Sequence, residues 1–297
     1  MKPLISLIAL NYNQTDITCE FLESTKKLTY PNYEIIVVDN GSNINPKEQV
    51  EAGHYPHTRL IISETNLGFT GGNNLGMREA KGDYMFIVNN DTEVTDNLLE
   101  ELLAPFLADD EVGVVSPKIK FFHHPDIIQY AGFKPINPYT GRTGAVGSRE
   151  KDEGQHDKLT ETYGAHGAAM MVKRSVIKEV GMFANNFFIY YEEWDWSARI
   201  RRAGYKIYYQ PKAIIYHKES ITMGKESAIK AYYHTRNRIL YMRRNSKKIQ
   251  LIVFSVFFAL AVIPKSLFRY LRNAQFGHIK AFTKGVAWNL TTTSISN

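Results

Sequence analysis

The chain has 297 residues, of which 44% are hydrophobic, 22% charged and 12% aromatic. This composition is typical of one large globular domain or two small ones, and it excludes a disordered chain, a collagen and a disulfide scaffold. The single cysteine, Cys19, cannot form an intrachain disulfide. The formal charge of 36 − 30 = +6 is unevenly spread, because residues 226–297 carry 12 − 1 = +11 and residues 1–225 carry 24 − 29 = −5. We therefore expect an acidic body and a basic extension.

The first part of the body alternates short apolar runs with segments of helical composition. The first run lacks the cleavage site of a signal peptide, so we expect a buried strand there. Such alternation predicts a parallel, doubly wound sheet, whose ligands bind at the carboxyl ends of the strands. The expected strands are Leu4–Leu10, Glu34–Val38, Arg59–Ser63 and Tyr84–Val88, and the expected helices are Thr15–Leu28, Asn74–Ala80 and Asp96–Leu107.

Residues 121–165 are rich in Gly, Pro, His and Asp and show little periodicity, which predicts a long loop over the site. Further elements are expected after it. Strands are predicted at Gly167–Val172, Tyr205–Tyr209 and Ala213–Tyr216, and helices at Lys173–Val180 and Glu192–Ala203.

Polar residues follow several of the predicted strands. Asn11 and Asp39 end the first two, and the Asp39 carboxylate suits hydrogen bonds from a base or ribose, with a turn-forming Asx residue as the alternative. The Gly- and Asn-rich stretch 66–76 lets the backbone approach a ligand closely, but it has neither P-loop nor dinucleotide-fold spacing. Simple loop geometry therefore remains an alternative there.

Two groups of polar residues suggest catalysis. Asn89-Asn90-Asp91 supplies oxygen ligands for Mg²⁺ or Mn²⁺, unless Asp91 only caps the next helix. His217, after a late strand, is either structural or a metal or diphosphate contact. Glu192, Glu193 and Asp195 begin a helix beside Trp194 and Trp196, where burial raises a carboxyl pKa and suits a general base. Asp195 has a structural alternative, an ion pair with Arg199 or Arg202.

The basic extension contains the apolar run Ile249–Ile263, followed by Pro264. At about 1.5 Å per residue it reaches roughly 22 Å, short of a bilayer core of roughly 30 Å. Lys and Arg flank it on both sides, which favours a helix lying on an anionic leaflet. A full span and a buried helix are the alternatives.

Taken in order, the motifs resemble the inverting family-two glycosyltransferases, which have the A-type nucleotide-sugar fold. Within that family they are most similar to the rhamnosyltransferase branch, whose members build cell-surface polysaccharide. The stretches that carry the resemblance are 6–13, 37–42, 66–69, 88–92 and 188–195, followed by His217 and Arg236-Asn237.

The charge split divides the chain into an expected catalytic nucleotide-sugar and acceptor domain at 1–225 and a basic helical, membrane-associating extension at 226–297, and the resemblance covers roughly residues 4–240. It implies that Glu193 is the catalytic base, that Glu192 and Asp195 position acceptor and base, and that Asp91 and His217 hold the metal. Asn89 replaces the first Asp of the family's D-x-D motif, and Glu193 stands where Asp is common. The nucleotide-sugar-binding residues that it implies are Asn11, Asp39, Asn66, Gly68, Asn74, Asn89 and Asn90.

The predicted activity is transfer of a sugar from a UDP- or dTDP-sugar to a hydroxyl of a polyprenyl-diphosphate-linked or other glycan, with Mg²⁺ or Mn²⁺, at the cytoplasmic face of the membrane. No nucleic-acid partner is expected, because the aromatics of the extension lie in one apolar block rather than among its cations. A homo-oligomer is left open. The alternatives are a nucleotidyltransferase-like enzyme, a nucleic-acid-binding protein and an inactive scaffold.

Overall fold

A ten-stranded sheet forms the centre of the computed structural model, which describes residues 2–218 and 227–292. Its order is β3-β2-β1-β4-β9-β6-β10-β5, with β7 beside β6 and β8 beside β10. The strands are β1 (Ile5–Asn11), β2 (Tyr33–Asn40), β3 (Thr58–Ser63), β4 (Tyr84–Val88), β5 (Thr92–Val94), β6 (Val112–Phe121), β7 (His124–Tyr130), β8 (Thr160–Glu161), β9 (Ala169–Lys173) and β10 (Lys206–His217).

The half of the sheet formed by β3, β2, β1 and β4 is parallel, as the sequence predicts. β9 enters antiparallel between β4 and β6, while β6 and β10 are parallel to each other. The sheet is therefore mixed around a parallel core, and the predicted α/β architecture is confirmed. The register aligns Asn11 with Asp39, so the polar ends of β1 and β2 lie side by side.

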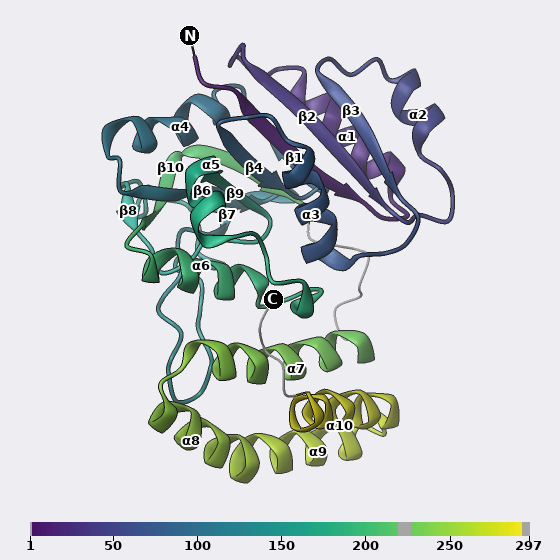
Figure 1. Cartoon of the computed structure of the whole chain (residues 1–297), viewed down its shortest axis with the longest axis vertical. Helices are drawn as coiled ribbons and strands as arrows, with labels where there is room; N and C mark the ends of the chain where they lie inside the picture. Colours follow the sequence, from purple (N-terminus) through teal and green to yellow (C-terminus); the bar gives the residue numbers. More distant parts are fainter. Residues whose placement is uncertain (1, 219–226, 293–297) are drawn as a thin grey trace.

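Helices cover both faces of the sheet (Figure 1). They are α1 (Thr15–Thr25), α2 (Lys47–Ala52), α3 (Gly68–Glu79), α4 (Leu98–Ala108), α5 (Arg174–Val180), α6 (Glu192–Arg202), α7 (Ala228–Asn245), α8 (Lys248–Phe257), α9 (Ile263–Arg272) and α10 (Phe276–Thr291), with a 3₁₀ turn η1 (Asn185–Phe187) and a π-helical turn η2 (Phe258–Val262).

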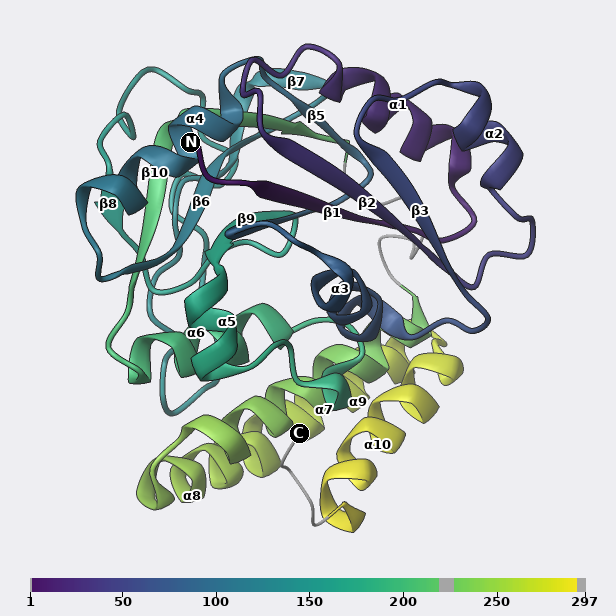
Figure 2. The ribbon, with the colours of Figure 1, turned by 45° about the horizontal axis from the view of Figure 1, so that its top comes forward.

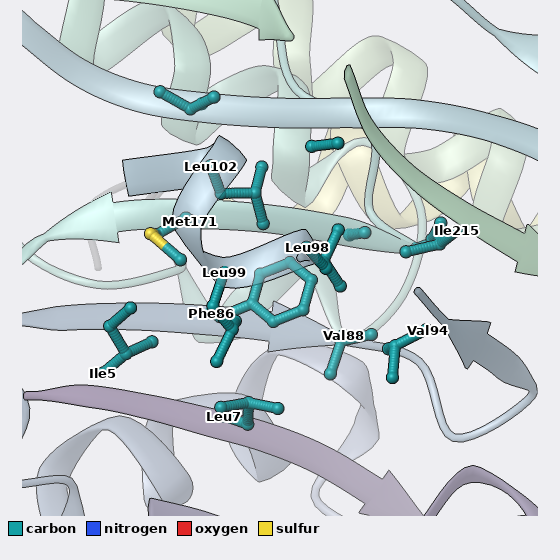
Figure 3. Close-up of a cluster of buried hydrophobic side chains, with 14 of the residues drawn as sticks. Ile5, Leu7, Phe86, Val88, Val94, Leu98, Leu99, Leu102, Met171 and Ile215 are labelled. Atoms are coloured by element: carbon teal, nitrogen blue, oxygen red, sulfur yellow. The ribbon is translucent and has the colours of Figure 1, made fainter. Parts of the chain in front are cut away.

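Two apolar clusters sandwich the sheet because its central strands bury both faces. On one face α1 and α4 pack on alternate strand residues, and Figure 3 shows Phe86 of β4 against Leu98 and Leu99 of α4. On the other face α3, α5 and α6 pack on the intervening residues, such as Ile8 and Ile87. Figure 2 shows that this second face is the one turned toward α7–α10.

α7–α10 form a layer of their own beside α6. A third apolar cluster holds this layer together, and it includes Met242, Phe254, Phe258 and Phe282. α8, η2 and α9 run on as one helix, Lys248–Arg272, which is 25 residues long. The predicted end at Ile263 is wrong, since the wide turn η2 lets the chain pass Pro264 without breaking the helix.

Several other expectations need correction. Residues 121–165 are not one loop, because β7 and β8 lie within them, and the strand β6 before them was not predicted. α2 was also not predicted. α3 begins at Gly68, six residues before the predicted Asn74, so most of the Gly- and Asn-rich stretch is helical. The predicted domain boundary after residue 225 lies outside the described residues.

Candidate active site

The carboxyl ends of β1, β2 and β4 are joined by a buried hydrogen-bond network. Asn11 Nδ2 donates to Asp39 Oδ1 at 2.7 Å, and Asn11 Oδ1 accepts from Thr18 Oγ1 at 2.8 Å. The same Thr18 oxygen accepts from Asn90 Nδ2, while the Ser42 amide and hydroxyl donate to Asp39. The structure thus brings three predicted nucleotide-sugar residues together. Three donors reach the Asp39 carboxylate, which has about four acceptor positions, so one remains for a ligand.

Gly68 and Asn66 lie where β2 meets the start of α3. Asn40 Nδ2 donates to Asn66 Oδ1 and to the Gly68 carbonyl, at 3.2 and 3.0 Å. Gly68 has φ +71°, and a Cβ there would lie 2.5 Å from the ring of Phe188. The Thr70 amide also donates to the Phe188 carbonyl. Gly68 is therefore required for α3 to contact the loop that carries Phe188.

Asn74 occupies the opposite end of that contact. Its Nδ2 donates to the Phe183 carbonyl and to Asn185 Oδ1, both at 2.8 Å, and its Oδ1 accepts from the Phe183 amide. The side chain is buried and joins α3 to the segment before α6. The structure therefore places Asn74 within a contact between α3 and the segment before α6, and no hydrogen bond of the described residues joins its side chain to the polar strand ends.

Asp91 and His217 face each other across the end of β4 and β10. His217 Nδ1 donates to Gln129 Oε1 at 2.8 Å, which leaves the Nε2 of the same ring facing Asp91. That Nε2 lies 3.1 Å from Asp91 Oδ1, a buried atom without a hydrogen-bond partner in the described residues. Asn89 Nδ2 lies 3.5 Å from the same Nε2. In this buried place the two atoms need a positive charge between them, which a proton on Nε2 or a bound cation would supply.

These atoms fit a hard divalent cation. A carboxylate and an imidazole are two suitable ligands for Mn²⁺, and Mg²⁺ or Mn²⁺ usually completes its shell with phosphate oxygens and water. No cluster of three or more His, Cys, Asp or Glu side chains that could hold a metal ion occurs within residues 2–218 and 227–292. A metal here would therefore depend on oxygens that a substrate brings. The alternative that Asp91 caps α4 does not apply, since that helix begins at Leu98.

Glu192 and Glu193 begin α6 as an adjacent pair of acids. Each has an Oε2 that is hidden from water and lacks a hydrogen-bond partner in the described part of the chain. Burial raises the pKa of Glu193 to about 7, partly opposed by the backbone N–H groups of Glu193 and Tyr191. Burial and then the charge of Glu193 raise the pKa of Glu192 well above its usual range. The pair therefore holds a proton up to neutral pH, and Glu193 is poised to act as a base.

The backbone before this pair is strained. Phe188, Tyr190 and Tyr191 have φ of +65°, +70° and +72°, a region that residues other than glycine rarely adopt. Asn237 of α7 holds this loop through Nδ2, which donates to the carbonyls of Phe187, Ile189 and Tyr190 at 2.7–2.9 Å.

Arg236 adds to the same clamp, since its Nη2 donates to the carbonyls of Asn186 and Phe187 at 2.6 Å. The Arg236-Asn237 motif is visible in the sequence, but its role becomes clear only when α7 is placed beside the loop. The motif therefore holds the loop that precedes Glu192 and Glu193.

Asp195 lies one turn along α6 and is completely buried. Its carboxylate accepts from Arg199 Nε at 2.9 Å, from Arg244 Nε at 2.7 Å and from Asn245 Nδ2 at 3.0 Å. Burial alone would raise the pKa of Asp195, but these hydrogen bonds and charges lower it below its usual range. The expected pairing of Asp195 with Arg199 is therefore present, whereas Arg202 donates to Asn245 instead. Through Arg244 and Asn245, Asp195 joins α6 to α7.

His166 was not among the predicted site residues. Its ring lies 6.4 Å from that of His217 and stacks on Phe133. Burial, and secondarily the charge of His217, lower the pKa of His166 to about 3, so the ring is neutral. The Ala168 amide donates to Nδ1 at 3.0 Å, which places the proton on Nε2. No described residue accepts that proton, so His166 offers a hydrogen-bond donor beside the metal-type site. A single His among small residues gave no sequence signal.

Comparison with known families matches the family described as Glycosyl transferase family 2 over residues 6–181, which is more than half of the chain. A protein of Sinorhizobium fredii, y4gI, is 29% identical over 82% of this chain, but the chain spans only 28% of its length. The low-salt glycan biosynthesis hexosyltransferase Agl10 of Haloferax volcanii is 26% identical, with 82% of this chain and 81% of that protein covered.

Two further comparisons concern a relative and a solved structure. An N-acetylglucosaminyl-diphospho-decaprenol L-rhamnosyltransferase of Mycobacterium tuberculosis is 22% identical, covering 82% of this chain and 85% of that protein. A mannosyltransferase of Pyrobaculum calidifontis, solved with GDP-Man and Mn²⁺, superposes with a TM-score of 0.59 and 15% identity, covering 99% of this chain and 89% of that one. The fold is therefore the A-type glycosyltransferase fold.

Proposed function

Because the chain belongs to glycosyl transferase family 2, we propose that it transfers a hexose or 6-deoxyhexose such as rhamnose from a UDP- or dTDP-sugar to a hydroxyl of a lipid-linked glycan, with inversion at the anomeric carbon. The observation that carries this proposal is the buried pair Glu192–Glu193, in which burial raises the pKa of Glu193 to about 7 and so leaves a base that titrates near neutral pH. No covalent sugar–enzyme intermediate is needed, since one base suffices for a single displacement.

The chemical step uses Glu193 directly. Its carboxylate accepts the proton of the acceptor hydroxyl while that oxygen attacks the anomeric carbon from the face opposite the diphosphate. The bond from the anomeric carbon to the diphosphate oxygen breaks, and the nucleoside diphosphate leaves. Asn237 and Arg236 keep the base in place by fixing the strained loop before it.

The donor would bind along the carboxyl ends of β1, β2 and β4. Asp39 has an acceptor position left for a base or ribose, and His166 has a free donor for a phosphate or sugar oxygen. Asp91 and His217, with Asn89 beside them, are the residues that would hold a divalent cation. When bound, such an ion neutralises charge on the departing diphosphate.

A membrane location is proposed on the basis of the helix Lys248–Arg272. By length and composition it is the one helix of the described residues that qualifies to cross a membrane, and only 17% of its most apolar window is buried. It carries exposed apolar side chains on its outer face, while its inner face packs on α7 and α10. Cations lie at both ends and along α9, which suits a helix lying in the cytoplasmic leaflet better than one spanning the bilayer. A polyprenyl-diphosphate-linked acceptor would be found there.

A transfer assay tests the proposal. Purified full-length protein would be incubated with UDP- and dTDP-sugars, Mn²⁺ and a polyprenyl-diphosphate-linked N-acetylglucosamine, with the product's anomeric configuration read by NMR. Mn²⁺-dependent transfer with inverted configuration is expected for one donor of the panel. Retention of configuration, or release of pyrophosphate without an acceptor, would instead mean that the reaction class is wrong.

A further inference from the structure

A cavity of about 470 Å³ opens between α7, the helix Lys248–Arg272 and the segment before α6. It lies outside the nucleotide-sugar site described above. Four cations line it, Arg142, Arg238, Lys265 and Arg269, together with apolar and aromatic side chains that include Phe258. This combination of clustered positive charge and an apolar wall needs an explanation.

The charge of this cavity is not balanced from within. None of the four cations forms an ion pair with a carboxylate of the described residues, and neither Arg244 nor Asp195, which pair with each other, lines the cavity. Arg238 is also buried, which lowers its pKa. A group of cations that includes a buried arginine is costly without a counter-charge. The cavity is therefore suited to an anion.

Arg238 is oriented toward such an anion. Its Nε and Nη2 donate to the Thr140 carbonyl, and its guanidinium lies 5.4 Å from the ring of Phe258. No hydrogen bond within the described residues uses Nη1, so one edge of the fork is free. A planar guanidinium held in this way is well suited to phosphate oxygens.

The helix that forms one wall also offers a path for an apolar chain. Its outward apolar residues recur every three or four positions, so they share one face. This face is exposed, and it continues past the cations of α9. Its exposed members are Ile249, Ile252, Val253, Val256, Leu260, Phe268 and Leu271.

The cavity also lies next to the base. Tyr191 lines it, donates its hydroxyl to the Gly141 carbonyl at 3.1 Å, and directly precedes Glu192 and Glu193. Burial raises the pKa of Tyr191 to about 12, and the charges of Arg238, Glu193 and Arg142 also act on its hydroxyl. A sugar attached to a group bound in this cavity would extend toward Glu193.

We propose that this cavity binds the diphosphate of a polyprenyl-diphosphate-linked acceptor, with the prenyl chain leaving along the exposed apolar face of Lys248–Arg272. The inference rests on the proposed function, whose acceptor it locates. Four cations in one cavity match two adjacent phosphates better than the single phosphate of a common anionic lipid. The aromatic wall would contact the first isoprene units.

A direct binding experiment tests the site without requiring turnover. Full-length protein would be titrated with geranylgeranyl diphosphate in neutral detergent micelles. The test variant is Arg142→Gln with Arg269→Gln, since both side chains are exposed and neither side chain hydrogen-bonds to another described residue. The matched control is Arg272→Gln with Lys280→Gln, which removes the same charge from the same layer but outside the cavity. We expect about a tenfold or larger loss of affinity in the test variant and less than about a twofold loss in the control.

Three results would overturn the site. The first is an equal loss of affinity for geranylgeranyl diphosphate in both variants, and the second is binding of inorganic pyrophosphate that is as tight as that of geranylgeranyl diphosphate. The third is that the test variant, but not the control, loses binding to phosphatidylcholine–phosphatidylglycerol vesicles that lack prenyl lipid. The last would identify a general headgroup site. Binding of UDP- and dTDP-sugars with Mn²⁺ is measured in parallel. If no donor binds but the test variant still loses affinity for geranylgeranyl diphosphate, the proposed function fails and the lipid site stands. If a donor binds but the test variant keeps its affinity for geranylgeranyl diphosphate, the lipid site fails and the proposed function stands.

Discussion

Replacing Glu193 by Gln keeps the shape of the side chain and removes its ability to take a proton. The carboxylate is the proposed base, so turnover should fall by about 10²–10⁴-fold, the usual contribution of a general base. Donor affinity should not change, because the nucleotide-sugar network lies at the ends of β1, β2 and β4. The parent enzyme should show an acid limb in kcat/KM near pH 7, since Glu193 must be ionised to act.

The same substitution should stabilise the fold at alkaline pH. The pKa of Glu193 rises from 4.5 to about 7 on folding, so the folded state binds this proton more tightly than the unfolded state. Stability contributed by the protonated form is therefore complete below about pH 4.5 and is lost as the pH rises through 7. At roughly 1.4 kcal/mol per pKa unit, the ionised carboxylate costs the fold about 3 kcal/mol above pH 8. For a chain of this size, Glu193→Gln should then raise Tm by about 5 °C.

Calorimetry at pH 4.5 and pH 8.5, with kcat and donor Kd at pH 7.5, measures both effects. Glu192→Gln is the matched control, since it removes the neighbouring carboxyl and leaves the base, so the acid limb should stay near pH 7. The Tm of each variant should equal that of the parent at pH 4.5 and differ from that of the parent at pH 8.5. A Glu193→Gln variant with near-parental kcat, or with a lower Tm at pH 8.5, would refute the assignment of a buried base.

Four further predictions concern other parts of the structure. Gly68→Ala places a Cβ against Phe188 and should lower kcat with a stability loss of about 1–3 kcal/mol, seen in kinetics and urea unfolding; parental kcat would contradict the contact. Asn237→Ala leaves the carbonyls of Ile189 and Tyr190 without their donor and should lower both Tm and kcat while donor Kd stays constant. Asp91→Ala should remove the Mn²⁺ dependence of donor binding in calorimetry, and unchanged Mn²⁺ dependence would exclude Asp91 as a ligand. Leu260→Glu should weaken vesicle flotation, whereas Leu107→Glu, an equally exposed leucine on α4, should not.

The polar strand ends could be predicted from the sequence because continuous apolar runs stop abruptly at Asn11, Asp39 and Asn89. The start of α3 could not, since Gly and Asn are poor helix formers. In the fold, a Cβ at Gly76 would lie 2.4 Å from Ile8, so the glycines are there to bring α3 close to β1. Tertiary packing thus outweighs local propensity in this helix.

The acidic cluster could be located but its members could not be separated. Glu193 and Asp195 look alike in sequence, yet one has an unpartnered oxygen and the other accepts from two arginines. The difference comes from Arg244, which is 49 residues away in α7. β7 was missed for a local reason, because its first residues, from His124, are exposed and polar. Long-range partners of this kind leave no spacing that a single sequence can reveal.

α7 joins the extension to the body through Asn237 and Arg244, and this has a practical consequence for obtaining the protein in solution. Cutting the chain before Asn237 would remove the α7 donors to Asp195, leaving Arg199, and the donors to the loop before Glu193, so the shortened protein should lose the geometry of the proposed base. Polar replacement of outward side chains on Lys248–Arg272 is the safer way to a detergent-free enzyme. At the proposed membrane location, the same contacts would let a bilayer influence turnover, because α7 lies between the outer helix and the loop before Glu193.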